Sequence, residues 1–236
     1  MAALVLKDLN VTVAGKEVCQ NIDLEIPEGE LHILLGPNGS GKSSLISAIM
    51  GVPVYQVTQG NITFNGKPLN TMPIDERARF GIGMSFQRPP VIRGVTIKMF
   101  AEAIGKSDLL KEYADRFLFS DFSERVLNEG FSGGEIKRWE VLRLFLQKPD
   151  LCLFDEPESG VDYALTAKIG QLINELMQEP TASGKRRSGL LITHAGFILD
   201  HVQAKQAHMI VNGKIVCSAE PRAMLQHIKS HGYVAM

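Results

Sequence analysis

The sequence has few cysteines, and their arrangement argues against several kinds of site. Cys19, Cys152 and Cys217 are odd in number, lie far apart and form no C-x-x-C pair. Such a pattern fits a reduced protein and gives no sign of a structural zinc or iron–sulfur site. The pattern predicts a reduced, cytoplasmic protein in which Cys152, inside the apolar run LCLF, is a small buried hydrophobic residue.

Long apolar runs and a surplus of positive charge are missing as well. The runs at 31–35 and 189–192 are far shorter than the roughly 20 apolar residues of a membrane-spanning helix. The first ten residues lack the layout of a signal peptide. A formal net charge of −1 provides no basic field for nucleic acid. We therefore expect neither membrane insertion nor a nucleic-acid partner.

What the sequence does contain is an alternation of short buried strands with helices. The first 30 residues or so alternate apolar and polar side chains, which predicts a small antiparallel β layer. Continuous apolar runs at 31–36, 151–156 and 189–194 are typical of parallel strands buried on both faces. Helical patterns follow the first two runs at 42–50 and 164–178. The chain is therefore predicted to have an α/β core.

Two further segments complete the predicted architecture. The segment from about 95 to 147 is mostly helical and predicts an inserted helical subdomain. Residues 207–219 predict a β-hairpin, because Asn-Gly stands at the expected turn. The polar loop at 180–189 carries three basic residues, which we interpret as a solvated turn rather than a nucleic-acid patch.

A phosphate-binding loop lies between the first buried strand and its helix. GPNGSGKS matches G-x-x-x-x-G-K-[ST] in the strand–helix context that this motif requires. Glycines let the loop wrap a phosphate with its N–H groups pointing inward, Lys42 reaches the β- and γ-phosphates, and Ser43 ligates Mg²⁺. Ser44 comes one residue too late for the metal. The alternative is an ordinary glycine-rich turn. The predicted nucleotide-binding residues here are Gly36, Pro37, Asn38, Gly39, Ser40, Gly41, Lys42, Ser43 and Ser44.

Two adjacent acids end the second buried strand. Two carboxylates at the tip of an apolar strand are costly unless a cation is near. We expect Asp155 to hold Mg²⁺ through water and Glu156 to serve as general base or water-orienting group. The alternative is that both acids only solvate a strand end.

Two single residues become candidate site residues once these two motifs are placed. Gln87, in SFQRPP, follows the β-rich part and could bond Mg²⁺ or the attacking water. His194 ends the third buried strand and could bond the γ-phosphate. Taken alone, each is more often an ordinary polar residue at a strand end.

The segment FSGGE at 131–135 presents half of a site. It precedes a helix predicted over 135–146, and glycines at a helix N-terminus favour anion binding. No lysine or metal-ligand set lies in this loop to complete a phosphate pocket.

In this order the motifs resemble the nucleotide-binding domain of the ATP-binding-cassette (ABC) family. GPNGSGKSS resembles its phosphate loop, Gln87 its Q-loop glutamine and FSGGE its signature motif, usually written L-S-G-G-Q. LCLFDEPESGVD is similar to the strand with two acids and the D-loop that ends at Asp162, and LLITH to the switch-histidine strand.

The resemblance implies a single P-loop NTPase domain over 1–236 that hydrolyses ATP with Mg²⁺. Its core, with an N-terminal antiparallel β subdomain, would span 1–88 and 147–236, and its helical subdomain 89–146. In this family two domains pair head to tail. Ser132, Gly133, Gly134 and Asp162 would then belong to the site of a second copy of the chain, which accounts for the half-site.

Longer segments resemble the SufC subfamily, the ATPases of Suf-type iron–sulfur cluster assembly. These segments are YQVTQGNITFNGKPL, ERARFGIGMSFQRPPVIRGV, VLNEGFSGGEIKRWE, DEPESGVD and the tail from 209 to 233. Phe131 and Glu135, in place of the usual leucine and glutamine, are typical of this subfamily. The resemblance implies a SufB-type or SufB–SufD-type scaffold as partner, remodelled by ATP-driven dimerisation. The alternatives are the ATP-binding subunit of a membrane transporter and a module that uses nucleotide only as a switch.

Overall fold

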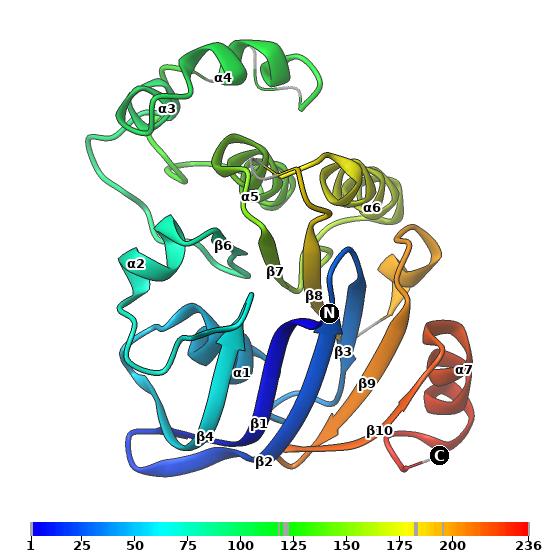
Figure 1. Cartoon of the computed structure of the whole chain (residues 1–236). Coiled ribbons are helices and arrows are strands. Elements are labelled where there is room, and N and C mark those ends of the chain that lie inside the picture. Colours follow the sequence, from blue (N-terminus) through cyan, green and yellow to red (C-terminus); the bar gives the residue numbers. More distant parts are fainter. Residues whose placement is uncertain (1, 118, 120–122, 182–183, 195, 236) are drawn as a thin grey trace.

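The computed structural model describes residues 2–117, 119, 123–181, 184–194 and 196–235. Two β-sheets stand beside each other with helices around them (Figure 1). Parts of two predicted segments, 118 and 120–122 in the helical segment and 182–183 in the polar loop, lie outside the described residues. No helix of the described chain combines the length and the apolar character needed to cross a bilayer.

The first sheet is antiparallel, as the alternating pattern predicts. Its strand order is β2-β1-β4-β5. The strands are β1 (Ala2–Val13), β2 (Lys16–Pro27), β4 (Tyr55–Phe64) and β5 (Lys67–Pro68). Alternate side chains of β2 are buried, because one face of this sheet packs on the core while the other meets water.

The second sheet has the order β10-β9-β3-β8-β7-β6. The strands are β3 (Leu31–Leu35), β6 (Ile82–Ser85), β7 (Leu151–Asp155), β8 (Ser188–Thr193), β9 (Gln206–Val211) and β10 (Lys214–Ala219). All neighbouring pairs are parallel except β9 with β10, which form the predicted hairpin. Asn212 and Gly213 at its turn both have positive φ, 49° and 78°, as a type I′ turn requires.

Helices cover both faces of this sheet. The helices are α1 (Lys42–Met50), α2 (Ile74–Arg79), α3 (Ile97–Ala103), α4 (Ser107–Ala114), α5 (Gly133–Gln147), α6 (Tyr163–Gln178) and α7 (Pro221–His231). The apolar side chains of α1 share one core with the antiparallel sheet, and those of α5 and α6 share another on the opposite face. In Figure 1, α3 and α4 stand apart from both sheets at the top, and α7 flanks β9 and β10.

The buried strands, α1, α6 and the C-terminal hairpin confirm the sequence predictions. Four elements of the described residues were not predicted: β6, α2, α7 and a short 3₁₀ helix at Phe197–Asp200. β6, α2 and the 3₁₀ helix are short. α7 was missed although Pro221 stands at its start and Met224, Leu225 and Ile228 follow at helical spacing.

One expectation was wrong: of the three basic residues in the loop at 180–189, Arg187 is fully buried. Its guanidinium donates to the carbonyl oxygens of Pro149, Leu176 and Glu179, so it closes the end of α6 rather than facing solvent.

Candidate functional site

The predicted site residues follow the carboxyl ends of four parallel strands. In the register of the sheet, Leu35 stands opposite Thr193, Asp155 opposite Ile192, and Ser85 opposite Phe154. The residues that come next along each strand therefore gather at one edge, as the crevice rule for open α/β sheets requires.

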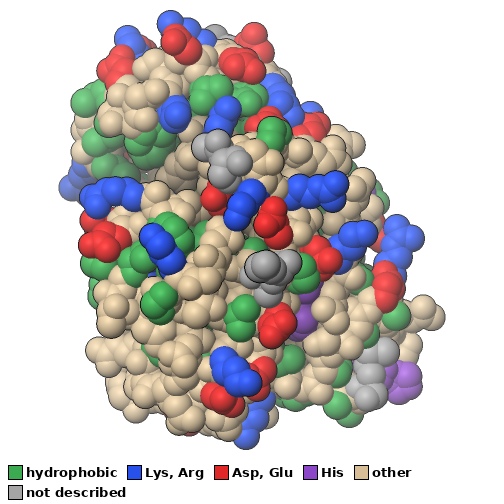
Figure 2. Space-filling view, viewed as in Figure 1, with side chains coloured by type: hydrophobic (Ala, Val, Ile, Leu, Met, Phe, Trp, Pro, Cys, Tyr) green, Lys and Arg blue, Asp and Glu red, His purple; other side chains and the backbone are tan. Residues whose placement is uncertain are grey.

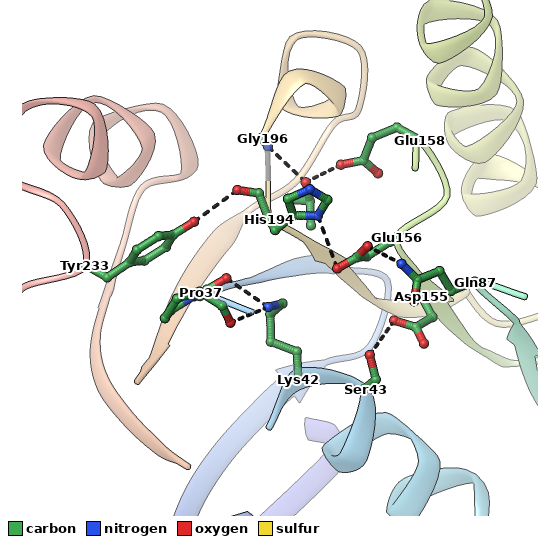
Figure 3. Close-up of polar contacts among 12 residues, drawn as sticks. Pro37, Lys42, Ser43, Gln87, Asp155, Glu156, Glu158, His194, Gly196 and Tyr233 are labelled. Carbon is green, nitrogen blue, oxygen red and sulfur yellow. Dashed lines mark hydrogen bonds and ion pairs between the residues drawn. The ribbon is translucent and has the colours of Figure 1, made fainter. Parts of the chain in front are cut away.

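Lys42 lies under the phosphate loop and is almost fully buried. Its Nζ donates to the carbonyl oxygens of Gly36 at 2.8 Å and of Pro37 at 2.9 Å (Figure 3). Burial lowers the pKa of Lys42, and the nearby charges of Glu156 and Asp155 oppose that effect. The ammonium is thus held beneath the loop, in reach of any anion that binds there.

The glycines of the loop are needed for different reasons. A Cβ at Gly36 would lie 2.3 Å from the Ile210 carbonyl oxygen, and one at Gly41 would lie 2.6 Å from that of Val18. Both positions therefore exclude a side chain because strands β9 and β2 pass so close. Gly39 has φ +78° and open space around it, so its requirement is conformational.

The Asp155 carboxylate is buried and pairs with Ser43. The Ser43 Oγ donates to Asp155 Oδ1 at 3.0 Å. Burial raises the pKa of the Asp155 carboxyl, and the Ser43 hydrogen bond and two lysines oppose that shift. A buried carboxylate beside a hydroxyl is the oxygen-donor arrangement that suits Mg²⁺.

Glu156 is the centre of the site. Gln87 Nε2 donates to its Oε2 at 2.5 Å, and His194 Nδ1 lies 3.2 Å from its Oε1 (Figure 3). Its backbone has φ +47°, a left-handed conformation that is strained for a glutamate and typical of functional positions. A carboxylate held between an amide and an imidazole can orient a water molecule beside a bound phosphate.

These side chains line one open pocket of about 510 Å³, within the usual range of ligand sites. The structure therefore brings together the phosphate loop, Gln87, Glu156 and His194, with Asp155 behind Ser43. Among the described residues, the lining is Val18, Asn38, Gly39, Gly41, Lys42, Ser43, Ser44, Gln87, Glu156, Ser159 and His194. The predicted site residues outside this lining are Gly36, Pro37 and Ser40 of the phosphate loop, Asp155, Ser132 to Gly134 and Asp162.

The signature segment forms the N-terminus of α5 on its own. Ser132 is the N-cap: its Oγ accepts from the Glu135 N–H, and its own N–H donates to Glu135 Oε2 at 2.6 Å. This reciprocal capping box stabilises the start of the helix. Ser132 and Gly133 remain exposed, so this helix N-terminus is open to an anion.

Asp162 is engaged locally in a similar way. Its carboxylate caps α6 by accepting from the Leu165 N–H at 2.8 Å. A Cβ at Gly134 would come within 2.6 Å of Leu165 Cδ2. The start of α5 therefore packs closely on the first turn of α6. A Cβ at Gly133 would lie 3.4 Å from the Gly160 carbonyl oxygen, so the signature loop also lies beside the D-loop of the same chain.

Two residues on α5 that sequence reasoning missed support the site from behind. Lys137 is buried and donates from Nζ to the carbonyl oxygens of Glu156 at 2.9 Å and Gln87 at 3.1 Å. Glu140 is also buried, accepts from the Phe86 N–H at 2.6 Å and pairs with Arg143 at 2.8 Å. The local signal in the sequence was that Lys137 and Glu140 are charged residues on a face of the predicted helix that is otherwise apolar.

Comparison with known proteins agrees with this geometry. The profile of the ABC transporter family matches residues 19–159. The chain is 35% identical to the probable ATP-dependent transporter SufC of Escherichia coli K12, over 98% of this chain and 97% of that protein. It is 34% identical to a probable ABC transporter ATP-binding protein of Streptococcus pyogenes serotype M18, over 100% and 95%.

Solved structures share the fold. A nucleotide-free ATP-binding cassette from an ABC transporter superposes with a TM-score of 0.79 at 21% identity, over 100% of both chains. The dimeric structure of a bacterial ABC transporter cassette gives a TM-score of 0.77 at 24% identity, over 93% of this chain and 99% of that one.

Proposed function

Because the chain belongs to the ABC transporter family and is an ABC ATPase, we propose that it powers iron–sulfur cluster assembly on a SufB/SufD-type scaffold. In this proposal the chain is cytoplasmic, and ATP-driven head-to-tail dimerisation of two copies remodels the scaffold. Residues 1–88 and 147–236 form the catalytic core, and 89–146 form the helical subdomain that meets the partner.

The phosphate loop holds the nucleotide in this proposal. Lys42 would exchange the carbonyl oxygens of Gly36 and Pro37 for β- and γ-phosphate oxygens, a charge-assisted contact of greater strength. The N–H groups at the start of α1 supply further donors, since the first turn of a helix leaves them without intrahelical partners.

Magnesium fits the oxygen atoms of the pocket. Ser43 Oγ and Asp155 Oδ1 are close enough to share one cation or its water ligands, and Gln87 lines the same pocket as Ser43. Ser43 and Gln87 would hold the ion directly and Asp155 through water. The ion would supply positive charge to the triphosphate.

Glu156 is the proposed general base. Its Oε1 and Oε2 atoms are oriented by His194 and Gln87, so one carboxylate can accept a proton from a water molecule aligned with the γ-phosphate. His194 would contact the γ-phosphate itself, and Gln87 would link the carboxylate to the helical subdomain.

The second half of the site comes from another copy of the chain. Ser132, Gly133 and Gly134 form an exposed helix N-terminus with no lysine of its own, and Asp162 lies on the same surface. In a head-to-tail pair, this surface would cover the nucleotide held by Lys42 of the partner. Closing the pair would expel water from the γ-phosphate.

One structural unit supports iron–sulfur assembly over membrane transport. Arg125 pairs with Glu135 at 3.1 Å, and its guanidinium lies 4.6 Å from the ring centroid of Phe131. Phe131 and Glu135, the two residues typical of the SufC subfamily, therefore both contact the same arginine. The similarity to SufC of Escherichia coli over nearly the full length of both chains adds further support. A transporter subunit remains the second candidate, since other relatives carry that description.

Identifying the natural partner tests the proposal. The tagged chain is recovered from its native host with ATP, from parallel membrane and soluble fractions, and the retained proteins are sequenced. A soluble SufB-type protein, alone or with a SufD-type protein, is the expected result. Recovery of a multi-span membrane protein instead would favour the transporter. The Lys42→Ala variant is the matched control for nucleotide-dependent capture.

A further inference from the structure

The backbone turn that carries His194 is held from two sides by residues outside the catalytic set. Among the described residues it comprises Thr193, which is the last residue of β8, followed by His194 and Gly196. Gly196 has φ +72°, a left-handed conformation that glycine adopts readily, and it precedes the 3₁₀ helix Phe197–Asp200. The His194 side chain branches from this turn. The position of the imidazole beside Glu156 therefore depends on the conformation of the turn.

The first support comes from the D-loop. The Gly196 N–H donates to Thr193 Oγ1 at 2.9 Å, and the Thr193 hydroxyl donates to a carboxylate oxygen of Glu158 (Figure 3). Glu158 is buried, and burial raises the pKa of its carboxyl. The turn is thus anchored to the segment that follows Glu156 in sequence.

The second support comes from the C-terminal segment, more than thirty residues away. The Tyr233 hydroxyl donates to the His194 carbonyl oxygen at 3.0 Å (Figure 3). A Cβ at Gly196 would lie 2.5 Å from Leu225 Cδ1, so α7 packs directly against the turn. Tyr233 is half-buried, and its ring packs on the same core as Leu225.

Tyr233 is itself held in place by the end of α7. The His227 imidazole contacts the Val234 carbonyl oxygen at 2.9 Å and stacks on His231 with ring centroids 4.8 Å apart. The last turn of α7 and the residues after it therefore form one folded unit. His231 and Val234 are exposed, and Figure 2 shows a histidine side chain in purple at the lower right, the region in which Figure 1 places α7.

We propose that Tyr233 is a positioning residue for His194: its hydroxyl fixes the peptide plane after the histidine and so holds the imidazole against Glu156. The hydroxyl touches neither Glu156 nor the phosphate loop, so it acts only through His194. The C-terminal helix thereby becomes part of the hydrolytic machinery. This inference rests on the proposed role of His194 in ATP hydrolysis.

A double-mutant cycle tests it. Tyr233→Phe removes one hydroxyl and leaves the ring packing intact. Loss of a single hydrogen bond of this kind corresponds to about three- to tenfold in rate. We expect kcat for ATP to fall by about that factor while KM changes less than about twofold, because the contact to be lost orients a group for the reaction rather than for binding.

The same substitution is then made in a His194→Ala background. If Tyr233 acts through the imidazole, Tyr233→Phe has no further effect on kcat there, whereas an independent structural role gives the same fold-loss in both backgrounds. Tyr113→Phe is the matched control: its hydroxyl donates to Glu179 at 3.2 Å, away from the pocket, and kcat should stay at the parent value.

The outcomes separate the two claims. A His194→Ala variant with parental turnover contradicts the proposed role of the histidine. A His194→Ala variant that is slow, combined with a Tyr233→Phe variant at the parent rate, overturns the positioning role alone. Equal loss from Tyr233→Phe in both backgrounds, or an equal loss from Tyr113→Phe, overturns it as well.

Discussion

The Nζ of Lys137 donates to the main-chain carbonyl oxygen of Glu156 over 2.9 Å. This bond joins α5, which begins at the signature loop, to the strained residue at the end of β7. A second bond from the same ammonium reaches the carbonyl oxygen of Gln87 at 3.1 Å. Glu156 and Gln87, whose side chains bond to each other, are therefore both tied to the signature helix by one buried lysine.

Replacing Lys137 by methionine should weaken both the fold and the site. Two buried carbonyl oxygens would lose a charged donor, which costs on the order of 1–3 kcal/mol. Removing the charge also leaves Asp155 and Glu158 with less compensation. Urea unfolding and steady-state ATP hydrolysis measure the two effects. Lys168→Met, at an exposed position of α6, is the control and should leave both unchanged, and parental stability of Lys137→Met would rule out a supporting role.

Replacing Lys42 by alanine should abolish tight nucleotide binding by the isolated chain. The substitution removes the one lysine at the phosphate loop, and its charge-assisted contacts with the phosphates have no substitute nearby. Binding of a fluorescent ATP analogue measures the effect. Nucleotide affinity within about threefold of the parent would contradict the assigned role of the loop.

Replacing Ser132 by arginine should separate binding from pairing. Ser132 is exposed and outside the lining of the pocket in its own chain, so ATP binding by the single chain should be nearly unchanged. The bulky cation should block nucleotide-dependent dimerisation and turnover. Light scattering with and without ATP measures the pairing. If this variant loses single-chain binding as severely as Lys42→Ala, the signature does not act in a second copy.

Replacing Glu156 by glutamine should lower turnover by about 10²-fold or more, since a general base contributes roughly that much. Nucleotide binding should persist, because Lys42 and the loop are unchanged. Single-turnover hydrolysis at saturating ATP, with the partner present, measures the effect. If parent and variant hydrolyse ATP equally slowly, Glu156 is not the base and a nucleotide-switch function gains support.

A buried histidine pair should make the fold sensitive to mild acid. His32 Nδ1 and His208 Nε2 lie 2.9 Å apart, between Glu30 at one end and Ser218 at the other. Burial, reinforced by His32, lowers the pKa of His208 from 6.5 to about 4. The folded protein keeps His208 neutral where the unfolded chain protonates it, so stability is complete above pH 6.5 and declines as the pH falls toward 4.

The loss from this group should reach about 2 kcal/mol by pH 5. Chemical unfolding of the parent and of His208→Gln at pH 7.5 and pH 5 isolates the contribution, because other titrating groups are common to both proteins. The parent should lose more stability than the variant over this interval. Equal losses would show that His208 does not carry the pH dependence.

Much of the site could be predicted because its residues lie in short, continuous sequence motifs. The phosphate loop, the two acids and His194 each follow an apolar run that reads as a buried strand. Parallel strands place their carboxyl ends at one edge, so the proximity of these groups followed from topology alone. Arg187 shows the limit of such reading, since a basic residue in a polar loop proved fully buried.

The sequence by itself determined the fold class, the phosphate loop and the candidate catalytic residues, because each depends on short-range periodicity or spacing. Only the tertiary structure decided which groups hold them: Lys137 behind Glu156, Glu158 beneath Thr193, and Tyr233 on the carbonyl of His194. These contacts join segments that are far apart in the chain. A hydrogen bond between them leaves no local pattern, because it depends on how the helices pack and not on the residues beside it.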